Sequence, residues 1–146
     1  MKQTLVNEQK IRSLLEASPL RMTKKREKVL RTLLTSDRPL SAEELRVQAE
    51  LSKSDLVTVY RTIEAFVGIG IVQGIPLESG GTIYELTEPG DHFHHFVCRE
   101  CHKTERLDLC LGHDLEEEAT KLGFRDIRHV MEVYGLCGEC PSPGQN

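Results

Sequence analysis

The sequence predicts an α+β fold built from two small domains, and three observations lead to this prediction. Helical patterns fill most of residues 7–68 of the 146-residue chain, and two short strand patterns follow them. The turn-forming run Glu88-Pro89-Gly90-Asp91 then interrupts the pattern. Beyond this run the sequence becomes strand-like and rich in cysteine and histidine. We therefore place one domain in residues 1–88 and a second, small α/β domain in residues 89–146.

Two helices are predicted at the start of the first domain. Residues 7–17 carry apolar side chains at helical spacing, and the Ser-Pro pair after them ends this pattern. Thr23 is a typical N-cap, and it predicts a helix over residues 24–35 whose apolar positions recur at helical spacing.

The rest of the first domain reads as two more helices and a hairpin. Ser41 begins a capping-box pattern, which predicts a helix to about residue 51, and a further polar cap predicts a helix over residues 54–68. Strand patterns follow at residues 69–75 and 82–86, with a glycine-rich turn between them. Short helices followed by a hairpin are typical of a winged-helix domain.

The charge of the chain is unevenly distributed. The net charge is −4, yet residues 1–88 hold 13 Lys/Arg against 12 Asp/Glu, while residues 89–146 hold 6 against 11. A local basic stripe can contact DNA phosphates although the whole chain is acidic, and a merely solvated helix face is the alternative. The basic residues of the stripe are Arg21, Lys24, Lys25, Arg26, Lys28 and Arg31. Arg21, Lys24 and Lys25 are our candidate phosphate contacts.

The helix over residues 54–68 is the candidate DNA-reading element. Its apolar side, at helical spacing, consists of Leu56, Val59, Ile63, Phe66 and Val67. In a helix-turn-helix the second helix enters the major groove, with residues near its N-terminus facing the base edges. Thr58 and Tyr60 are suited to contact thymine methyl groups, and Arg61 is suited to a phosphate or a guanine. A small helical bundle without a nucleic-acid partner remains the alternative.

Two Cys-x-x-Cys pairs predict a structural zinc site. Cys98 pairs with Cys101, and Cys137 pairs with Cys140. A two-residue gap lets both thiolates of a pair bind one tetrahedral ion, and two pairs complete the shell that Zn²⁺ prefers. A redox role would normally follow a βαβ pattern, which the sequence lacks. We expect the remaining Cys110 to be a small buried hydrophobic residue.

The histidines of the second domain predict a second metal site. Strand alternation puts His92 and His94 on one face, and a second strand pattern over residues 126–136 carries His129. His113 precedes a short acidic helix. We expect these four imidazoles to converge on one ion, and such a set suits Zn²⁺, Ni²⁺, Co²⁺ or Cu²⁺. Solvated surface histidines are the alternative.

Together these motifs resemble the ferric uptake regulator family, over roughly residues 20–140. The resemblance rests on the winged-helix pattern, Thr58-Val59-Tyr60-Arg61-Thr62, the histidine-rich strand, the first cysteine pair, and Tyr134-Gly135-Leu136-Cys137 with Cys140. It implies a homodimer, with the C-terminal domain as the dimerisation module. It also implies that the winged helices bind a palindromic operator and repress genes when the sensory metal is bound.

The resemblance also implies which residues bind the metals. The two cysteine pairs match the family's structural zinc ligands, and His92, His94 and His129 match three ligands of its regulatory site. The family has a Glu at the position of His113, and Glu116 is the alternative if the alignment shifts. His94 stands where iron-sensing members commonly have an Asp.

Glu85 and His95 are a weaker prediction for a further metal site. Strand alternation puts His95 on the face opposite His94, where Glu85 of the preceding strand is a candidate partner. The resemblance places the family's hinge site at Pro39, Glu85, Phe93 and His95, so two of its usual ligands are missing here.

An imidazole-rich site without a carboxylate favours Zn²⁺ over Fe²⁺ and Mn²⁺ as the regulatory metal. We therefore expect a zinc-sensing repressor with a structural zinc as well, and no enzymatic activity. The alternatives are an iron- or peroxide-sensing member of the same family, with iron or manganese bound, and a zinc-stabilised adaptor or enzyme that does not bind DNA.

The expected location is the cytoplasm, without a membrane partner. No apolar run approaches the roughly 20 residues that span a bilayer, and Met1-Lys2-Gln3 does not begin a signal peptide. Cysteines in that compartment stay reduced, which favours metal binding over disulfides.

Overall fold

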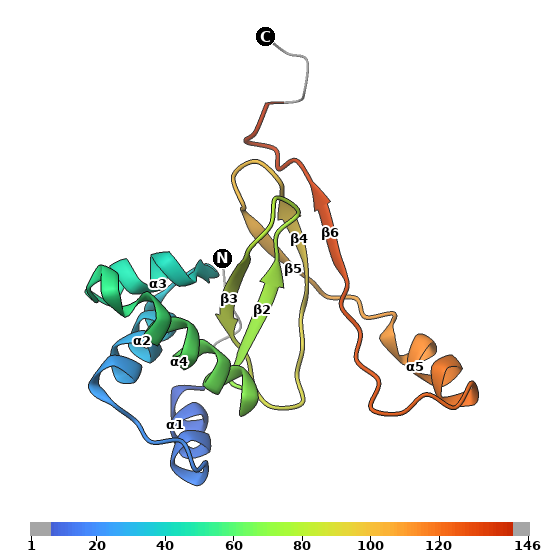
Figure 1. Ribbon diagram of the computed structural model, residues 1–146. Helices are drawn as coiled ribbons and strands as arrows, with labels where there is room; N and C mark the ends of the chain where they lie inside the picture. The colour runs from blue at the N-terminus through green and yellow to red at the C-terminus, as the bar shows by residue number, and fades with distance from the viewer. Residues whose placement is uncertain (1–6, 142–146) are drawn as a thin grey trace. The chain divides into compact units, whose positions relative to one another are not determined.

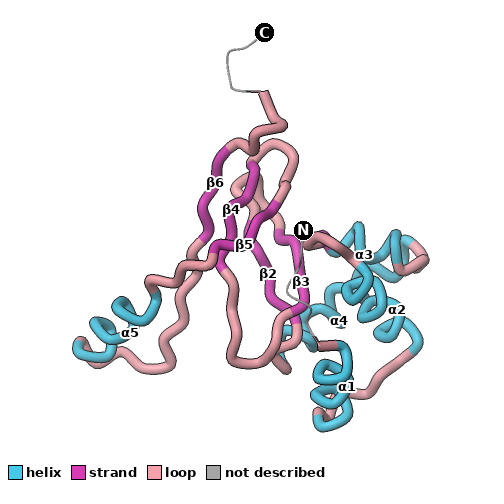
Figure 2. Tube along the Cα trace, turned by 180° about the vertical axis from the view of Figure 1, so that it is seen from behind, coloured by secondary structure: helices cyan, strands magenta, loops and turns pink. Residues whose placement is uncertain are grey.

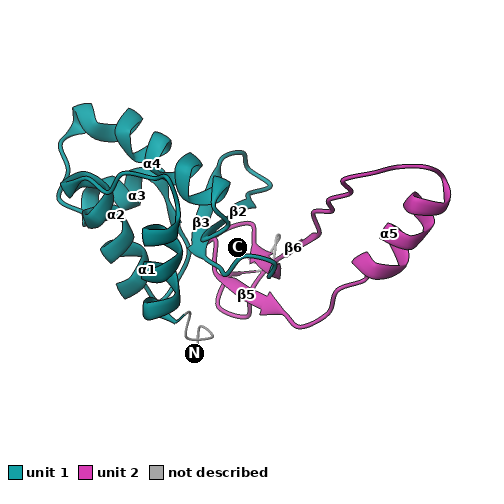
Figure 3. Ribbon diagram, turned by 90° about the horizontal axis from the view of Figure 1, so that it is seen from below, with its two compact units in different colours: residues 1–92 teal, residues 93–146 magenta. Residues whose placement is uncertain are grey.

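The computed structural model describes residues 7–141 of the chain (Figure 1). The chain forms two compact units, divided between His92 and Phe93 and coloured separately in Figure 3. Unit 1 denotes the part up to His92 and unit 2 the part from Phe93. The boundary expected from the sequence lay earlier, between Glu88 and Pro89. No helix within residues 7–141 is long and apolar enough to cross a membrane.

Within residues 7–92, unit 1 contains four α-helices, and a short 3₁₀ turn, Lys53–Asp55, leads into the last of them. The helices are α1 (Glu8–Ala17), α2 (Lys24–Thr35), α3 (Ala42–Gln48) and α4 (Leu56–Gly68). Two of the predicted caps are present, because the Thr23 side chain accepts from the Arg26 amide and Ser41 forms a reciprocal capping box with Glu44. These caps satisfy amides that have no partner within the helix, so the helices begin where the sequence predicts.

A three-stranded antiparallel sheet completes unit 1. It consists of β1 (Leu40–Ser41), β2 (Val72–Pro76) and β3 (Thr82–Leu86), in the order β1-β3-β2. Gly80 and Gly81 both have positive φ in the turn of the β2–β3 hairpin, a conformation that glycine adopts without strain. The hairpin is the wing of a winged-helix domain. The α+β fold class is therefore confirmed.

The apolar core lies in unit 1, where the buried sides of the helices pack together. Leu30, Leu45, Val59 and Phe66 are fully buried there. The sequence also placed Val67 on the buried side, and this was wrong, since Val67 is 46% exposed. Thr62 is buried instead of Val67, and the Thr62 hydroxyl donates to the Thr58 carbonyl at 2.8 Å. This bond removes the cost of burying a hydroxyl group.

The described part of unit 2, residues 93–141, is a small mixed sheet with one helix. Its elements are β4 (His94–Cys98), β5 (Thr104–Leu107), α5 (Gly112–Lys121) and β6 (Glu132–Gly135). The sheet order is β5-β4-β6, with β4 antiparallel to β5 and parallel to β6 (Figure 2). The strand predicted over residues 126–136 was too long, because the chain begins to pair with β4 only at Glu132. His129 therefore lies in the loop before β6.

Candidate metal centres

The two cysteine pairs come together at one end of the unit 2 sheet. Cys98 ends β4, and the parallel register pairs it with Gly135 at the end of β6. Cys101 lies in the turn after β4, and Cys137 and Cys140 lie in the turn after β6. The Arg99 amide donates to the Gly135 carbonyl at 2.9 Å and holds the two turns against each other. Strand pairing thus brings together thiols that lie far apart in the sequence.

The distances among these sulfurs fit a tetrahedral ion. The Cys98 and Cys140 sulfurs are 3.7 Å apart, and the Cys101 and Cys137 sulfurs are 3.6 Å apart. A tetrahedral zinc with bonds of about 2.3 Å separates its sulfur ligands by about 3.8 Å. A disulfide would bring two sulfurs to about 2.05 Å, and all of these cysteines are free thiols.

The electrostatics of the four thiols also favour a bound cation. Backbone N–H groups of Cys101 and Cys137 donate to the Cys98 sulfur and lower the pKa of this thiol to about 6. The neighbouring thiols of Cys101 and Cys137, followed by burial, raise the pKa of Cys140 to about 12. Adjacent thiolates repel each other, so all four deprotonate together only when a cation compensates their charge. The residues present fit a structural zinc.

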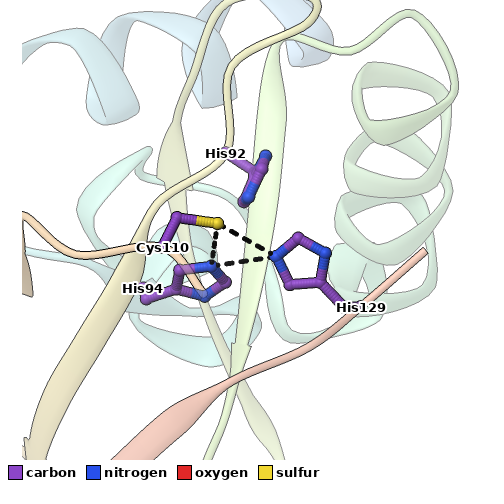
Figure 4. A group of neighbouring side chains, drawn as sticks. All are labelled: His92, His94, Cys110 and His129. Atoms are coloured by element: carbon purple, nitrogen blue, oxygen red, sulfur yellow. Dashed lines mark hydrogen bonds between the residues drawn. The ribbon is translucent and has the colours of Figure 1, made fainter. Parts of the chain in front are cut away.

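A second group of potential ligands lies at the other end of β4. It combines His92, His94, Cys110 and His129, whose ligand atoms all lie within 4.8 Å of one another. His94 is the first residue of β4, Cys110 comes shortly before α5, and His129 comes shortly before β6. Figure 4 shows these four side chains gathered around one centre. We refer to them as the His/Cys group.

The spacing within the His/Cys group again fits a metal ion. The Nε2 atoms of His94 and His129 are 3.1 Å apart, and each lies 3.4 Å from the Cys110 sulfur. Tetrahedral zinc separates two nitrogen ligands by about 3.3 Å, and a nitrogen and a sulfur by about 3.6 Å. The observed distances are slightly shorter, and they are compatible with such a shell.

Hydrogen bonds from the rear orient two of these imidazoles. His94 Nδ1 lies 3.0 Å from the Met131 carbonyl oxygen, and His129 Nδ1 lies 3.0 Å from Oε1 of Glu116. Both partners accept hydrogen bonds, so Nδ1 carries a proton in each ring, and in the neutral imidazole the lone pair is then on Nε2. Each Nε2 faces the group, as in metal sites where an oxygen supports a ligating histidine.

Gly112 gives the His129 ring the space that it occupies. A Cβ added to Gly112 would lie 2.0 Å from Cε1 of this ring, so every other residue type would displace it. The His129 ring therefore packs against the first turn of α5 more closely than a side chain at position 112 would allow. Gly112 is a positioning residue that the sequence analysis did not identify.

Comparison with known proteins identifies the family. The profile of the ferric uptake regulator family matches residues 17–134. The chain belongs to this family. The ferric uptake regulation protein of Campylobacter jejuni is 31% identical over 140 residues, which cover 90% of this chain and 87% of that protein. The zinc uptake regulation protein of Mycobacterium tuberculosis is 33% identical over 134 residues, covering 88% of this chain and all of that protein.

Solved structures of the ferric uptake regulator family share the fold. A zinc uptake regulator in complex with zinc and DNA matches with a TM-score of 0.66 and 27% identity, covering 88% of this chain and 89% of that chain. The ferric uptake regulator of Vibrio cholerae matches with a TM-score of 0.65 and 28% identity, covering 86% and 98%. The family comprises transcription regulators, so the prediction that this chain is not an enzyme is confirmed.

Two expectations about the regulatory ligands need correction. His113 does not lie in the His/Cys group, and Cys110, which we expected to be buried, is exposed and belongs to it. The reason is the start of α5, where Gly112 faces the His129 ring and His113 lies beside Glu116 and Glu117 in a shallow depression along the helix. Glu116 itself contacts the rear of His129.

Two residues at the positions of the family's hinge site, Glu85 and His95, belong to different units of this chain. Glu85 lies in unit 1 and His95 in unit 2, so their pairing stays a prediction. Within the sheet of unit 2, Arg106 of β5 and Glu132 of β6 flank His95 on either side. His95 Nδ1 lies 3.3 Å from Oε2 of Glu132, and the Arg106 guanidinium stacks 3.7 Å above the Phe93 ring.

The candidate DNA contacts form part of the surface of unit 1. Arg21, Lys24 and Lys25 are exposed at the start of α2, and Lys25 forms an ion pair of 2.6 Å with Asp55. On α4, Tyr60 is 48% exposed, Arg61 is exposed and Thr58 is half-buried. Their roles in DNA binding stay predictions, and their exposure leaves them accessible to a ligand.

Proposed function

We propose that this chain is a zinc-responsive DNA-binding repressor that binds a palindromic operator as a homodimer. It would carry one structural zinc on its four-cysteine site and one regulatory zinc on the His/Cys group. A regulator of this kind acts where the DNA is, in the cytoplasm. The zinc uptake regulation protein of Mycobacterium tuberculosis and the zinc uptake regulator solved with zinc and DNA support this proposal as relatives.

The choice of zinc depends on one observation above all. The His/Cys group contains imidazoles and a thiol but no carboxylate, since Glu116 contacts the rear of His129 and does not join the group. Fe²⁺ and Mn²⁺ favour oxygen ligands more than Zn²⁺ does. The donor set therefore supports zinc over iron and manganese.

The position of His92 suggests how metal binding reaches the DNA-binding part. His92 lies in the segment that joins β3 to β4, close in sequence to His94 at the start of β4. A metal held by all four residues would fix the end of this joining segment and so restrict the orientations that the winged helix can adopt. Restricting a dimer to the spacing of two operator half-sites raises its affinity for DNA.

The same proposal assigns roles on unit 1. The exposed side of α4, with Tyr60 and Arg61, would face base edges in the major groove. Arg21 and Lys24 would contact phosphates, which makes binding weaken steeply as the salt concentration rises.

Titration of DNA binding with buffered metals tests the proposal. Operator duplexes are first selected from a random library with the zinc-loaded protein, and binding is then measured against free Zn²⁺, Fe²⁺ and Mn²⁺ under anaerobic conditions. Binding should follow Zn²⁺ in the wild type and lose its metal dependence in His129→Ala. The matched control is His102→Ala, which removes an exposed imidazole outside both metal-binding groups. Binding without metal, or an equal response to Fe²⁺, contradicts the proposal.

A further inference from the structure

Cys110 is the thiol that the four-cysteine site does not use. It lies between β5 and α5, and its side chain is exposed. Its sulfur lies 3.4 Å from Nε2 of His94 and 3.4 Å from Nε2 of His129. The amide of Gly112 donates to the same sulfur at 3.4 Å. This sulfur therefore lies at one corner of the His/Cys group.

The geometry of these three atoms is that of ligands around one ion. Met131 and Glu116 accept hydrogen bonds from the Nδ1 atoms of His94 and His129, so the Nε2 atom of each ring faces the group. The two Nε2 atoms lie 3.1 Å apart, and the Cys110 sulfur completes a triangle with them. A cation at the centre would bind both nitrogens and the sulfur at once. The Gly112 amide is then a suitable donor to a metal-bound thiolate.

We propose that Cys110 is a ligand of the regulatory metal and that its sulfur determines the preference of this site for Zn²⁺. The regulatory shell would consist of three imidazoles and one thiolate. Thiolate is a soft donor that binds Zn²⁺ well and Mn²⁺ poorly, whereas imidazole discriminates less. This inference rests on the proposed function only for the regulatory role of the ion, because ligation by Cys110 is measurable without DNA.

Cobalt spectroscopy detects the sulfur–metal bond directly. The structural site is kept loaded with zinc, Co²⁺ is added to the regulatory site, and the near-ultraviolet band of thiolate-to-cobalt charge transfer is recorded. The wild type should show this band. Cys110→Ser should lose it while keeping the visible bands of cobalt bound by imidazole. The matched control Leu109→Ser changes the exposed neighbour of Cys110 and should keep the band.

The outcomes that overturn this proposal are specific. A wild-type protein that binds Co²⁺ without the charge-transfer band excludes Cys110 as a ligand, as does a band that persists in Cys110→Ser. His129→Ala should lose the regulatory cobalt. A band of unchanged intensity in that variant would place the sulfur–cobalt bond in the four-cysteine site and also overturn the proposal.

Metal affinity tests the selectivity. Cys110→Ser should lower Zn²⁺ affinity by about 10- to 100-fold or more, since changes behind a ligand already cost this much. Its affinity for Mn²⁺ should change less, so the ratio of the two affinities should fall. An unchanged ratio means that the sulfur does not determine the preference.

Alkylation of the wild type gives a second measurement that does not depend on a folded variant. In protein stripped of its regulatory metal, iodoacetamide should modify the exposed Cys110, and added Zn²⁺ should protect it, as followed by peptide mass spectrometry. Equal modification with and without Zn²⁺ contradicts ligation. If protection and the cobalt band are observed while DNA binding ignores zinc, the proposed function fails and the ligand assignment stands.

Discussion

Unit 1 and unit 2 differ in what stabilises them. In unit 1, the helices and the hairpin bury a continuous apolar cluster that includes Phe66, Leu30 and Leu45. In unit 2, the buried apolar side chains among residues 93–141 are Val97 and Cys98, and His94 and His95 are buried beside them. Burial of apolar surface is the main favourable term in folding. The second unit therefore needs another source of stability, and zinc bound by its four cysteines would provide one.

The largest expected effect comes from removing a ligand of the structural zinc. Cys137→Ser should lose this zinc and leave unit 2 without stable structure, because structural zinc contributes about 10–16 kcal/mol in small zinc domains. Zinc content and hydrogen exchange of the amides in β4 and β6 measure the outcome. Cys110→Ser removes a thiol outside the four-cysteine site and should keep its zinc. Protected β4 and β6 amides in zinc-free Cys137→Ser would show that unit 2 does not depend on the metal.

Truncating a core side chain of unit 1 should lower the stability of unit 1 and leave the zinc content of unit 2 unchanged. Phe66→Ala should lower the free energy of unfolding of unit 1 by about 3–5 kcal/mol, the usual cost of removing a buried aromatic ring. The zinc content should stay unchanged, since the metal ligands of the four-cysteine site all lie in unit 2. Val67→Ala on the exposed side of α4 is the control and should cost less than about 0.5 kcal/mol. Release of the structural zinc by Phe66→Ala would mean that the two units are stabilised together.

The smallest of these effects concerns the support behind a ligand. Glu116→Ala should lower the zinc affinity of the His/Cys group by about 10- to 100-fold, because His129 loses the carboxylate that orients its ring. Competition with a chelator of known affinity measures this change. Glu117→Ala, one residue further along α5 and exposed, should leave the affinity unchanged. Equal losses in both variants would attribute the effect to the net charge of α5 and not to the contact with His129.

Local signals in the sequence predicted unit 1 well for a physical reason. Caps at Thr23 and Ser41 and the glycine turn of the hairpin depend on neighbouring residues, and periodic apolar positions record which side of a helix is buried. The error at Val67 came from extending the buried side of α4 by one residue past Phe66. Even there, the existence and type of the element were correct.

The regulatory group was harder to predict because chain geometry over long range determines it. Cys110 lies in a loop without periodicity, so no pattern indicated which way its side chain faces. The start of α5 brings Gly112 against His129, and this close approach excludes His113 from the group. The cysteine pairs were easier to recognise, since the spacing of ligands for one ion is visible in the sequence itself.

The row of side chains across the middle of the unit 2 sheet has a consequence for the response to metal starvation. Arg106, His95 and Glu132 are cross-strand neighbours there. A guanidinium keeps its charge at every physiological pH, and a chelator cannot remove it. When the regulatory ion leaves and the structural zinc stays, this row is unchanged, because none of its members belongs to either group of metal ligands. The sheet that carries His94 can then persist as a template for the returning ion.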